Sequence, residues 1–449
     1  MAATRSQLRS WLLRVAAAAL GAQLLCAPAK AQRIVASPEY DAMFAQVLRE
    51  PANLDLSFRF AEVATAAGDY EAAIGALERM LFYNPALPRV RLELGILYFR
   101  LGSYEMARSY LAGALAGADA PPEVRARVEP FLFEIDRRLA TTQWSGFGQL
   151  GVRFQTNANA GPTSSLVRGA GFDVILDRRF VKRPDWNLFG LAAVRHIHDF
   201  DNQRGDVWET NLVGYAARQF KIERLDLGLA EIQTGPRLAL MPDLWVGSSI
   251  RPYVLANAVT LGNSSYLTTF GAGVSLGLPL PGGVLFEPFV EERQRRFENT
   301  DQYPIVAQQT GRLSTAGAPV QGPVWGSVRW QARAAYIRND ARADFNAYDQ
   351  VAFDIGFPVE FGGFWASPRP WVLVPTAGFS RSHYDQPNLI IDPFVRRQDR
   401  EWRAGAMLDI PVWQQVGIGI QVQYAVTNSN ISNYDMNNLS VVFGPTVRF

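Results

Sequence analysis

The spacing of hydrophobic residues changes once along the chain, from a helical period to an alternating one. Between residues 38 and 140 apolar residues recur every three or four positions, which predicts amphipathic helices. Beyond Thr141 they recur at every second position, which predicts β-strands. The alternation is clear in residues 416–424, where Val416, Ile418, Ile420, Val422 and Tyr424 alternate with glycine and glutamine. The pattern therefore predicts a helical region followed by an all-β region.

Within the helical region the sequence repeats itself at an offset of 34 residues. This is the period of the tetratricopeptide repeat, a pair of antiparallel helices that stacks on its neighbours. We expect two full repeats, a half repeat before Pro51 and a closing helix over 121–140. The matching positions are Gly68, Tyr70, Ala73 and Leu77, which recur as Gly102, Tyr104, Ala107 and Leu111, together with Pro51 and Pro85 and with Phe60 and Leu94.

The first helix of each repeat lines the concave face of such a stack, and concave faces of this kind commonly hold extended peptides or partner proteins. A single residue on this face more often serves in packing or lies in solvent, so only the surface as a whole is a candidate binding site. Its members are Asp55, Phe58, Glu62, Arg89, Leu92, Ile96, Phe99 and Arg100.

The alternating region fits a soluble sandwich with its apolar face inside or a transmembrane barrel with that face toward lipid. The region from Trp144 to Phe449 contains fifteen strand candidates. A single-chain bacterial barrel closes with an even number of strands, so we leave out the weakest candidate, residues 312–321, which Pro319 interrupts. The prediction is an antiparallel barrel of about fourteen strands, with short turns at 182–185, 280–283 and 361–364.

The last strand alternates up to an aromatic residue, Phe449, which is a feature of outer-membrane barrels. Outer-membrane lipid and the barrel assembly machinery are therefore expected partners. The polar face of the strands would line the barrel lumen. Its clearest members are Arg153, Arg329, Gln331, Arg333, Gln421 and Gln423.

Residues 1–31 have the three parts of a secretory signal peptide: arginines, an apolar stretch over 15–25, and Ala29-Lys30-Ala31 before a cleavage site at Gln32. The only cysteine, Cys26, would leave with this segment. Removing its four basic and no acidic residues changes the net charge from +2 to −2, so nothing predicts nucleic-acid binding. After this segment no run of about 18 apolar residues follows, which predicts that no helix spans a membrane.

Composition adds little chemistry. The 449 residues are 48% hydrophobic with a mean hydropathy of −0.04, as alternation predicts. His196 and His198 lie two positions apart without a third metal ligand nearby, His383 lies far from both, and no nucleotide-binding glycine loop is present. We therefore predict no enzyme activity and no cofactor. Arginine outnumbers lysine 41 to 3, and its scatter favours codon bias over lipopolysaccharide binding.

The chain resembles the surface lipoprotein assembly modifier (Slam) family, in which a short periplasmic tetratricopeptide domain precedes an outer-membrane barrel. The resemblance rests on residues 92–115 (LELGILYFRLGSYEMARSYLAGAL), 121–138 (PPEVRARVEPFLFEIDRR) and 146–162 (GFGQLGVRFQTNANAGP) and on the aromatic-ended C-terminus. It implies a translocator without catalytic residues that moves client lipoproteins, or soluble secreted proteins, from the periplasm across the outer membrane of a Gram-negative bacterium.

The expected organisation is a signal peptide (1–31), a periplasmic tetratricopeptide-like helical domain (32–142) and an outer-membrane β-barrel (143–449). The alternative is an exopolysaccharide export porin, which also joins periplasmic helical repeats to a barrel. Such an exporter would be expected to carry aromatic and acidic groups along its lumen, whereas the clearest lumen faces here show arginine, glutamine and glycine.

Overall fold

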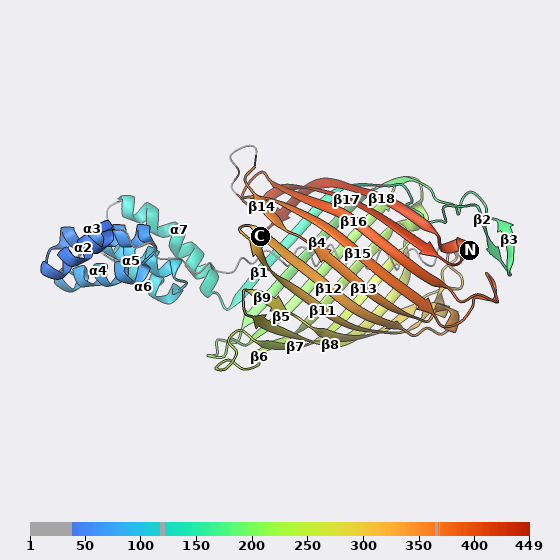
Figure 1. Cartoon of the computed structure of the whole chain (residues 1–449), viewed down its shortest axis with the longest axis horizontal. Helices are drawn as coiled ribbons and strands as arrows, with labels where there is room; N and C mark the ends of the chain where they lie inside the picture. Colours follow the sequence, from blue (N-terminus) through green and yellow to red (C-terminus); the bar gives the residue numbers. More distant parts are fainter. Residues whose placement is uncertain (1–37, 117–121, 364–366, 368) are drawn as a thin grey trace. The chain divides into compact units, whose positions relative to one another are not determined.

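The computed structural model describes residues 38–116, 122–363, 367 and 369–449 (Figure 1). The chain forms two compact units, and the division between them falls between Gln143 and Trp144. Each unit is described by itself. The predicted signal peptide lies outside the described residues.

The helical unit consists, in its described part, of six helices that form the predicted repeats. Helices α3 and α4 make one repeat and α5 and α6 the next, while α2 is the half repeat and α7 closes the stack. Their bounds are α2 (Pro38–Arg49), α3 (Leu54–Ala67), α4 (Tyr70–Tyr83), α5 (Pro88–Arg100), α6 (Tyr104–Leu115) and α7 (Pro122–Leu139).

The repeated residues have the roles that the 34-residue period predicts. Gly68 and Gly102 follow the first helix of each repeat with φ of 84° and 77°, a left-handed conformation that glycine adopts without strain. Ala73 and Ala107 are fully buried, so the helices approach closely there. The helical part of the predicted fold class is confirmed.

The second unit is a closed antiparallel barrel of fourteen strands, because β1 pairs with both β4 and β18. Two of the fourteen are interrupted, at Pro288 and Pro358, and each therefore carries two labels. The strands are β1 (Thr142–Gln155), β4 (Asp185–Asp199), β5 (Val207–Gln219), β6 (Leu227–Ala239), β7 (Ser249–Leu261), β8 (Ser264–Leu280), β9 (Val284–Phe286) with β10 (Phe289–Phe297), β11 (Gly311–Trp325), β12 (Val328–Asn339), β13 (Tyr348–Gly356) with β14 (Val359–Phe361), β15 (Trp371–Tyr384), β16 (Gln398–Pro411), β17 (Val416–Ser429) and β18 (Met436–Arg448).

The predicted number of strands is confirmed, but two details of the prediction are wrong. The segment that we left out, residues 312–321, lies inside β11. Pro319 is tolerated because it lies beside the break between β9 and β10, where regular pairing already stops. There the backbone N–H of Glu287 donates to the carbonyl oxygen of Pro319 at 2.9 Å. Residues 182–185 are not a turn, since they end the long connection 156–184 and begin β4.

The two ends of the barrel differ. At the end where β1 begins and β18 ends, which we call the terminal end, the connections span residues 200–206, 240–248, 281–283, 326–327, 362–370 and 412–415. At the opposite end, the loop end, they span residues 156–184, 220–226, 262–263, 298–310, 340–347, 385–397 and 430–435. The longest of them, residues 156–184, carries the hairpin of β2 (Leu166–Gly169) and β3 (Phe172–Ile175), which Figure 1 labels at the loop end of the barrel.

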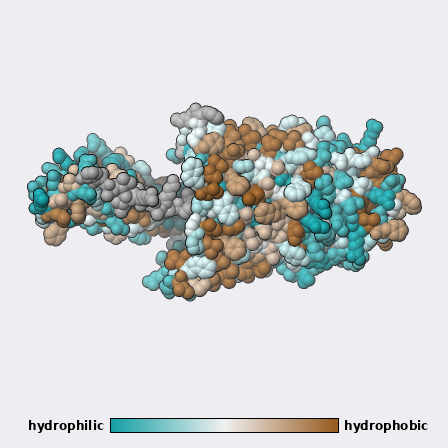
Figure 2. Space-filling view, viewed as in Figure 1, coloured by the Kyte–Doolittle hydropathy of each residue, from teal (hydrophilic) through white to brown (hydrophobic). Residues whose placement is uncertain are grey.

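Alternation along the strands places apolar side chains outside and polar side chains inside. Outward residues such as Leu150, Phe270 and Trp402 are exposed, whereas Asn187 and Glu209 are buried within the barrel. Figure 2 shows brown side chains over the barrel wall and teal ones toward the loop end. This inverted polarity is typical of a transmembrane barrel. Among the described helices, none has the length and apolar content needed to cross a membrane.

Candidate functional site

Charged side chains from four consecutive strands meet inside the barrel around Glu209 of β5. This carboxylate forms ion pairs with Arg195 of β4 at 2.9 Å, Arg237 of β6 at 2.7 Å and Arg251 of β7 at 3.5 Å. Glu209 is only 3% exposed. The carboxylate of Glu287 also interacts electrostatically with these three arginines, so three guanidinium groups share two carboxylates and a local positive excess remains.

Two further clusters continue the charged inner wall around the barrel. Arg293 of β10 pairs with Glu231 at 2.8 Å and with Glu291 at 2.5 Å. Arg403 of β16 pairs with Asp354 at 2.7 Å and with Glu401 at 2.9 Å. Each cluster joins strands that are not sequence neighbours, so charge pairing supports the packing of the interior as well as its polarity.

The six residues predicted to line the lumen all alternate with outward apolar residues. Arg153 of β1 contacts Asn187 and Tyr215, and Arg333 of β12 lies opposite Asp354 in the strand register. Arg329 and Gln331 share the inner face of β12 with Arg333, while Gln421 and Gln423 lie on β17. Three of the six residues thus share β12, two share β17 and one lies on β1. Their role in a lumen stays a prediction.

Sequence reasoning missed the three charged clusters around Glu209, Arg293 and Arg403. Glu291, Arg293 and Arg295 share the inner face of β10, but Glu292 and Arg296 beside them are charged too, so the sequence shows a charged run and does not single out the inward members. Likewise, nothing in the sequence relates Arg195 to Arg251, because only the strand register brings both to Glu209.

The predicted concave face of the helical unit divides into covered and exposed residues. Leu92 and Ile96 are 1% and 7% exposed and lie in a core shared with α6 and α7. Phe99 packs against Phe131 of α7 at 5.2 Å between ring centroids, and Phe58 is half-buried. Leu92, Ile96 and Phe99 pack in the core that α7 completes, whereas Phe58 packs against the core of the first repeat. The exposed members of the predicted surface are the charged ones: Asp55, Glu62, Arg89 and Arg100.

Tyrosine hydroxyls bridge successive helices of this unit. Tyr98 of α5 and Tyr110 of α6 stack at 5.4 Å and both donate to Glu78 of α4, at 2.8 and 3.0 Å. Burial and the bond to Glu78 raise the pKa of Tyr98 to about 12. The bond that Tyr40 of α2 donates to Asp69, at 2.6 Å, raises the pKa of Tyr40 to about 12 as well. These phenols remain protonated donors at neutral pH.

At the loop end three connections form a single cap. Arg168 of β2 pairs with Asp392 at 3.1 Å, and its backbone exchanges hydrogen bonds with the side chain of Asn433 at 2.8 and 2.9 Å. Backbone donation from Phe394 is the main cause that lowers the pKa of Asp392. The cap also exposes large apolar side chains: Leu166, Phe172, Ile175, Leu389, Ile390 and Phe394.

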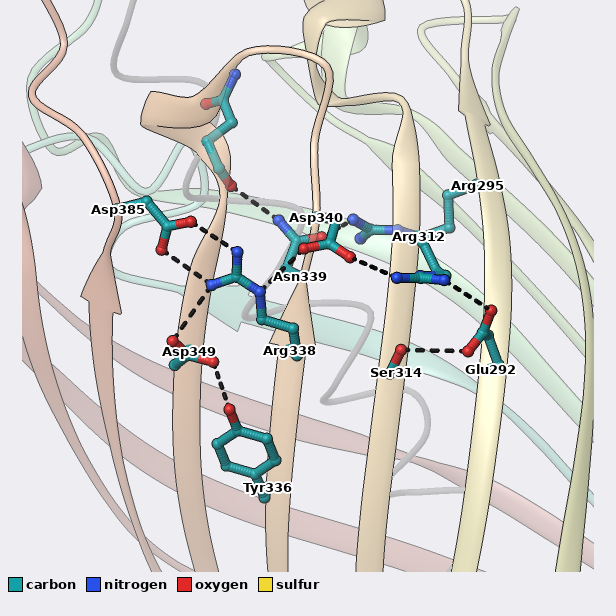
Figure 3. A network of polar contacts seen from close by, with 11 residues as sticks. Glu292, Arg295, Arg312, Ser314, Tyr336, Arg338, Asn339, Asp340, Asp349 and Asp385 are labelled. Carbon is teal, nitrogen blue, oxygen red and sulfur yellow. Dashed lines mark hydrogen bonds and ion pairs between the residues drawn. The ribbon is translucent and has the colours of Figure 1, made fainter.

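A charged network lies on the outer wall near the loop end, across β10 to β13 (Figure 3). Arg338 pairs with Asp385 at 2.7 Å, Asp340 at 2.9 Å and Asp349 at 3.2 Å. Arg312 contacts Asp340 at 3.3 Å and Glu292 at 3.6 Å. Since hydrocarbon does not solvate charge, this network marks the limit of the apolar belt at the loop end.

Comparison with known proteins supports the helical repeats. The family model described as tetratricopeptide repeat matches residues 64–126. No curated protein matches. Among solved structures, the Yersinia enterocolitica type III secretion translocator chaperone SycD is 19% identical, covers 22% of this chain and 70% of its own, and has a TM-score of 0.21.

Two further solved structures match a larger share of the chain. Pseudomonas putida OprB is 10% identical with a TM-score of 0.34, covering 69% of this chain and 94% of its own. A bacterial polysaccharide outer membrane secretin is 13% identical with a TM-score of 0.32, and the match covers 67% of this chain and 98% of the secretin chain. The family match and the strand pairing together describe a tetratricopeptide-repeat region followed by a closed fourteen-strand antiparallel barrel.

Proposed function

We propose that this protein is an outer-membrane translocator for client lipoproteins or secreted proteins, as its resemblance to the Slam family implies. The helical unit lies in the periplasm and captures the client, and the barrel assists its passage. The main supporting observation is the charged inner wall within an apolar outer belt, on the same chain as peptide-binding-type repeats. An interior lined by Glu209, Glu231, Arg293 and Arg403 gives a polypeptide a polar path through hydrocarbon.

Protease shaving of intact cells, with and without the gene, tests the proposal. We expect at least one surface protein to lose accessibility to protease in the deletion strain and to accumulate inside the outer membrane. Complementation with the full chain restores display. Unchanged display of every surface protein would contradict a translocator.

Site-specific crosslinking then tests the two candidate surfaces. The only native cysteine, Cys26, lies in the predicted signal peptide, so one introduced cysteine labels one site. Glu62→Cys on the exposed helical face and Gln421→Cys on β17 are expected to capture the same client. Glu39→Cys on α2, exposed but outside the predicted face, is the matched control and captures none.

Polysaccharide export is the second candidate, and one observation favours it. The inner wall carries carboxylates, such as Glu231 and Glu401, and aromatic rings, such as Phe189, Tyr215 and Tyr253, which were not visible in the clearest sequence patterns. Aromatic and acidic groups of this kind suit carbohydrate. Loss of an extracellular polymer from the deletion strain, with all surface proteins intact, would select this function instead.

A further inference from the structure

An apolar groove of about 780 Å³ runs obliquely across the outer wall of the barrel, from β5 to β12. Most of its lining consists of two neighbouring rows of outward residues, which the strand register joins across seven consecutive strands. The row nearer the terminal end comprises Trp208, Pro236, Pro252, Val274, Val290 and Ala316 and ends at Tyr336.

The second row, nearer the loop end, changes from apolar to charged along its length. It begins with Thr234, Val254 and Ala272 and continues through Glu292 and Ser314 to Arg338, just beyond the groove. Transmembrane strands tilt by roughly 35–45°, so a row that crosses them rises along the barrel axis. Trp208 is accordingly the second residue of β5 at the terminal end, whereas Ser314 is the fourth residue of β11 at the loop end.

The floor of the groove has a local cause in the sequence. Pro236 and Pro252 lie opposite each other between the pairs Thr234–Val254 and Leu238–Ile250, where regular pairing of β6 with β7 is interrupted. Proline cannot donate a backbone hydrogen bond, which explains the interruption. Small Ala272 and Ala316 continue the floor, between the larger side chains of Val254, Val290 and Tyr336. The result is a channel for a flexible chain.

The dimensions fit an acyl chain. Six steps between seven strands, at about 4.8 Å each, give a path of roughly 29 Å. The hydrocarbon core is about 30 Å thick and holds two opposed chains, so one chain fits within the groove. Because the groove faces the bilayer, acyl chains surround it in the membrane.

The charged end of the groove defines the headgroup. Glu292, Ser314 and Tyr336 belong both to the groove lining and to the network of Figure 3. Arg312 and Glu292 lie 3.6 Å apart with 54% and 58% of their side chains exposed. They offer opposite charges side by side, and guanidinium groups bind phosphate well. The ion pairs on the outer wall join four carboxylates to two guanidinium groups, Arg312 and Arg338, so the charge there disfavours a polyanionic head. Arg295, which Figure 3 also draws, is buried and contacts Asn339.

We propose that this groove is a binding site for a zwitterionic phospholipid. One acyl chain lies along the two rows, the phosphate contacts Arg312, and the ammonium group contacts Glu292. The site is separate from the barrel interior, so it requires neither of the functions proposed above.

Native mass spectrometry of the full chain in detergent, titrated with phosphatidylethanolamine, tests this site. We expect Ala316→Trp, which fills the floor, to raise the dissociation constant about tenfold. Ala404→Trp places the same side chain on the outer face of β16, outside the groove, and leaves binding unchanged. Heat-modifiable migration in electrophoresis verifies that each barrel is folded, and Ala272→Trp is a second groove variant should Ala316→Trp fail to fold.

The headgroup is tested with phosphatidylglycerol carrying the same acyl chains. The wild-type chain is expected to prefer phosphatidylethanolamine, and Glu292→Gln to abolish that preference while Arg400→Gln, on the outer face of β16, retains it. Equal binding of the two lipids by the wild type would overturn the headgroup assignment. Equal lipid binding by Ala316→Trp and Ala404→Trp would overturn the site.

Discussion

The two units of this chain bury opposite kinds of side chain. In the helical unit Leu94 and Leu111 are fully buried and charged residues lie outside. In the barrel Leu150 and Phe270 point outward, with 66% of each exposed, while Glu209 is inside. An apolar residue therefore marks the protein core in the helical unit and the outer wall in the barrel. An exposed apolar residue is unfavourable on the helical unit, which faces water, and favourable on the barrel wall, which faces lipid. The same substitution must therefore have different effects in the two units.

The largest difference is expected for leucine truncation. Leu111→Ala leaves a cavity between α5, α6 and α7 and is expected to lower the stability of the helical unit by about 2–5 kcal/mol. Leu150→Ala on β1 should cost under about 1 kcal/mol, because lipid refills the space and is as apolar as leucine. Urea unfolding of the full chain in phospholipid vesicles, followed by circular dichroism and by heat-modifiable migration, measures both. Similar losses would contradict the assignment of Leu150 to the lipid face.

A second pair of substitutions introduces charge at exposed phenylalanines. Phe270→Arg on β8 is expected to destabilise the barrel by about 2–4 kcal/mol, because the arginine enters hydrocarbon. Phe82→Arg on α4, at a site with 82% exposure, should stay within about 0.5 kcal/mol, because this site faces water. The same vesicle unfolding experiment applies. A neutral Phe270→Arg would place β8 outside the apolar belt.

The third prediction concerns charge inside the barrel. Glu209→Gln leaves Arg195, Arg237 and Arg251 without their shared carboxylate and is expected to cost about 1–3 kcal/mol. Glu292→Gln, on the exposed outer wall, should cost about 0–1 kcal/mol. Barrel unfolding at low and high salt separates them, because salt screens the exposed charges around Glu292 far more than the charges around the buried Glu209, so the loss in Glu209→Gln should persist at high salt. Equal effects would mean that the Glu209 cluster is solvated like the surface.

The sequence could predict the architecture because both periods are local. A 34-residue repeat and a two-residue alternation need no knowledge of partners in space, and an even strand number follows from closure. The error over residues 312–321 arose because Pro319 is read as a strand breaker. Its tolerance depends on the break between β9 and β10 next to it, which is a property of the neighbouring strand.

The candidate sites were less predictable because they depend on how neighbouring strands align and on which helices pack over a predicted surface. Glu209 acquires its three arginines only when β4 to β7 align, and the outer groove needs two prolines from different strands to lie opposite each other. On the helical side, the repeat pattern places Leu92 and Ile96 on the first helix of a repeat. It does not show that α7 covers them.

The smallest expected effect concerns Tyr98 and Tyr110 of the helical unit. Unlike the leucine and phenylalanine substitutions, it is tested in the helical unit alone. Tyr98→Phe removes the hydrogen bond to Glu78 and is expected to cost about 0.5–1.5 kcal/mol at neutral pH. The pKa of Tyr98 is about 12 in the folded chain and 10.0 ordinarily, so its contribution is complete below pH 10 and is lost as the pH rises toward 12. Helical unfolding followed by circular dichroism between pH 8 and 12 measures this loss, and Tyr98→Phe should reduce it. Tyr83→Phe, at an exposed site on α4, serves as the control. A pH dependence that is identical in wild type and Tyr98→Phe would show that the phenol does not link the repeats through Glu78.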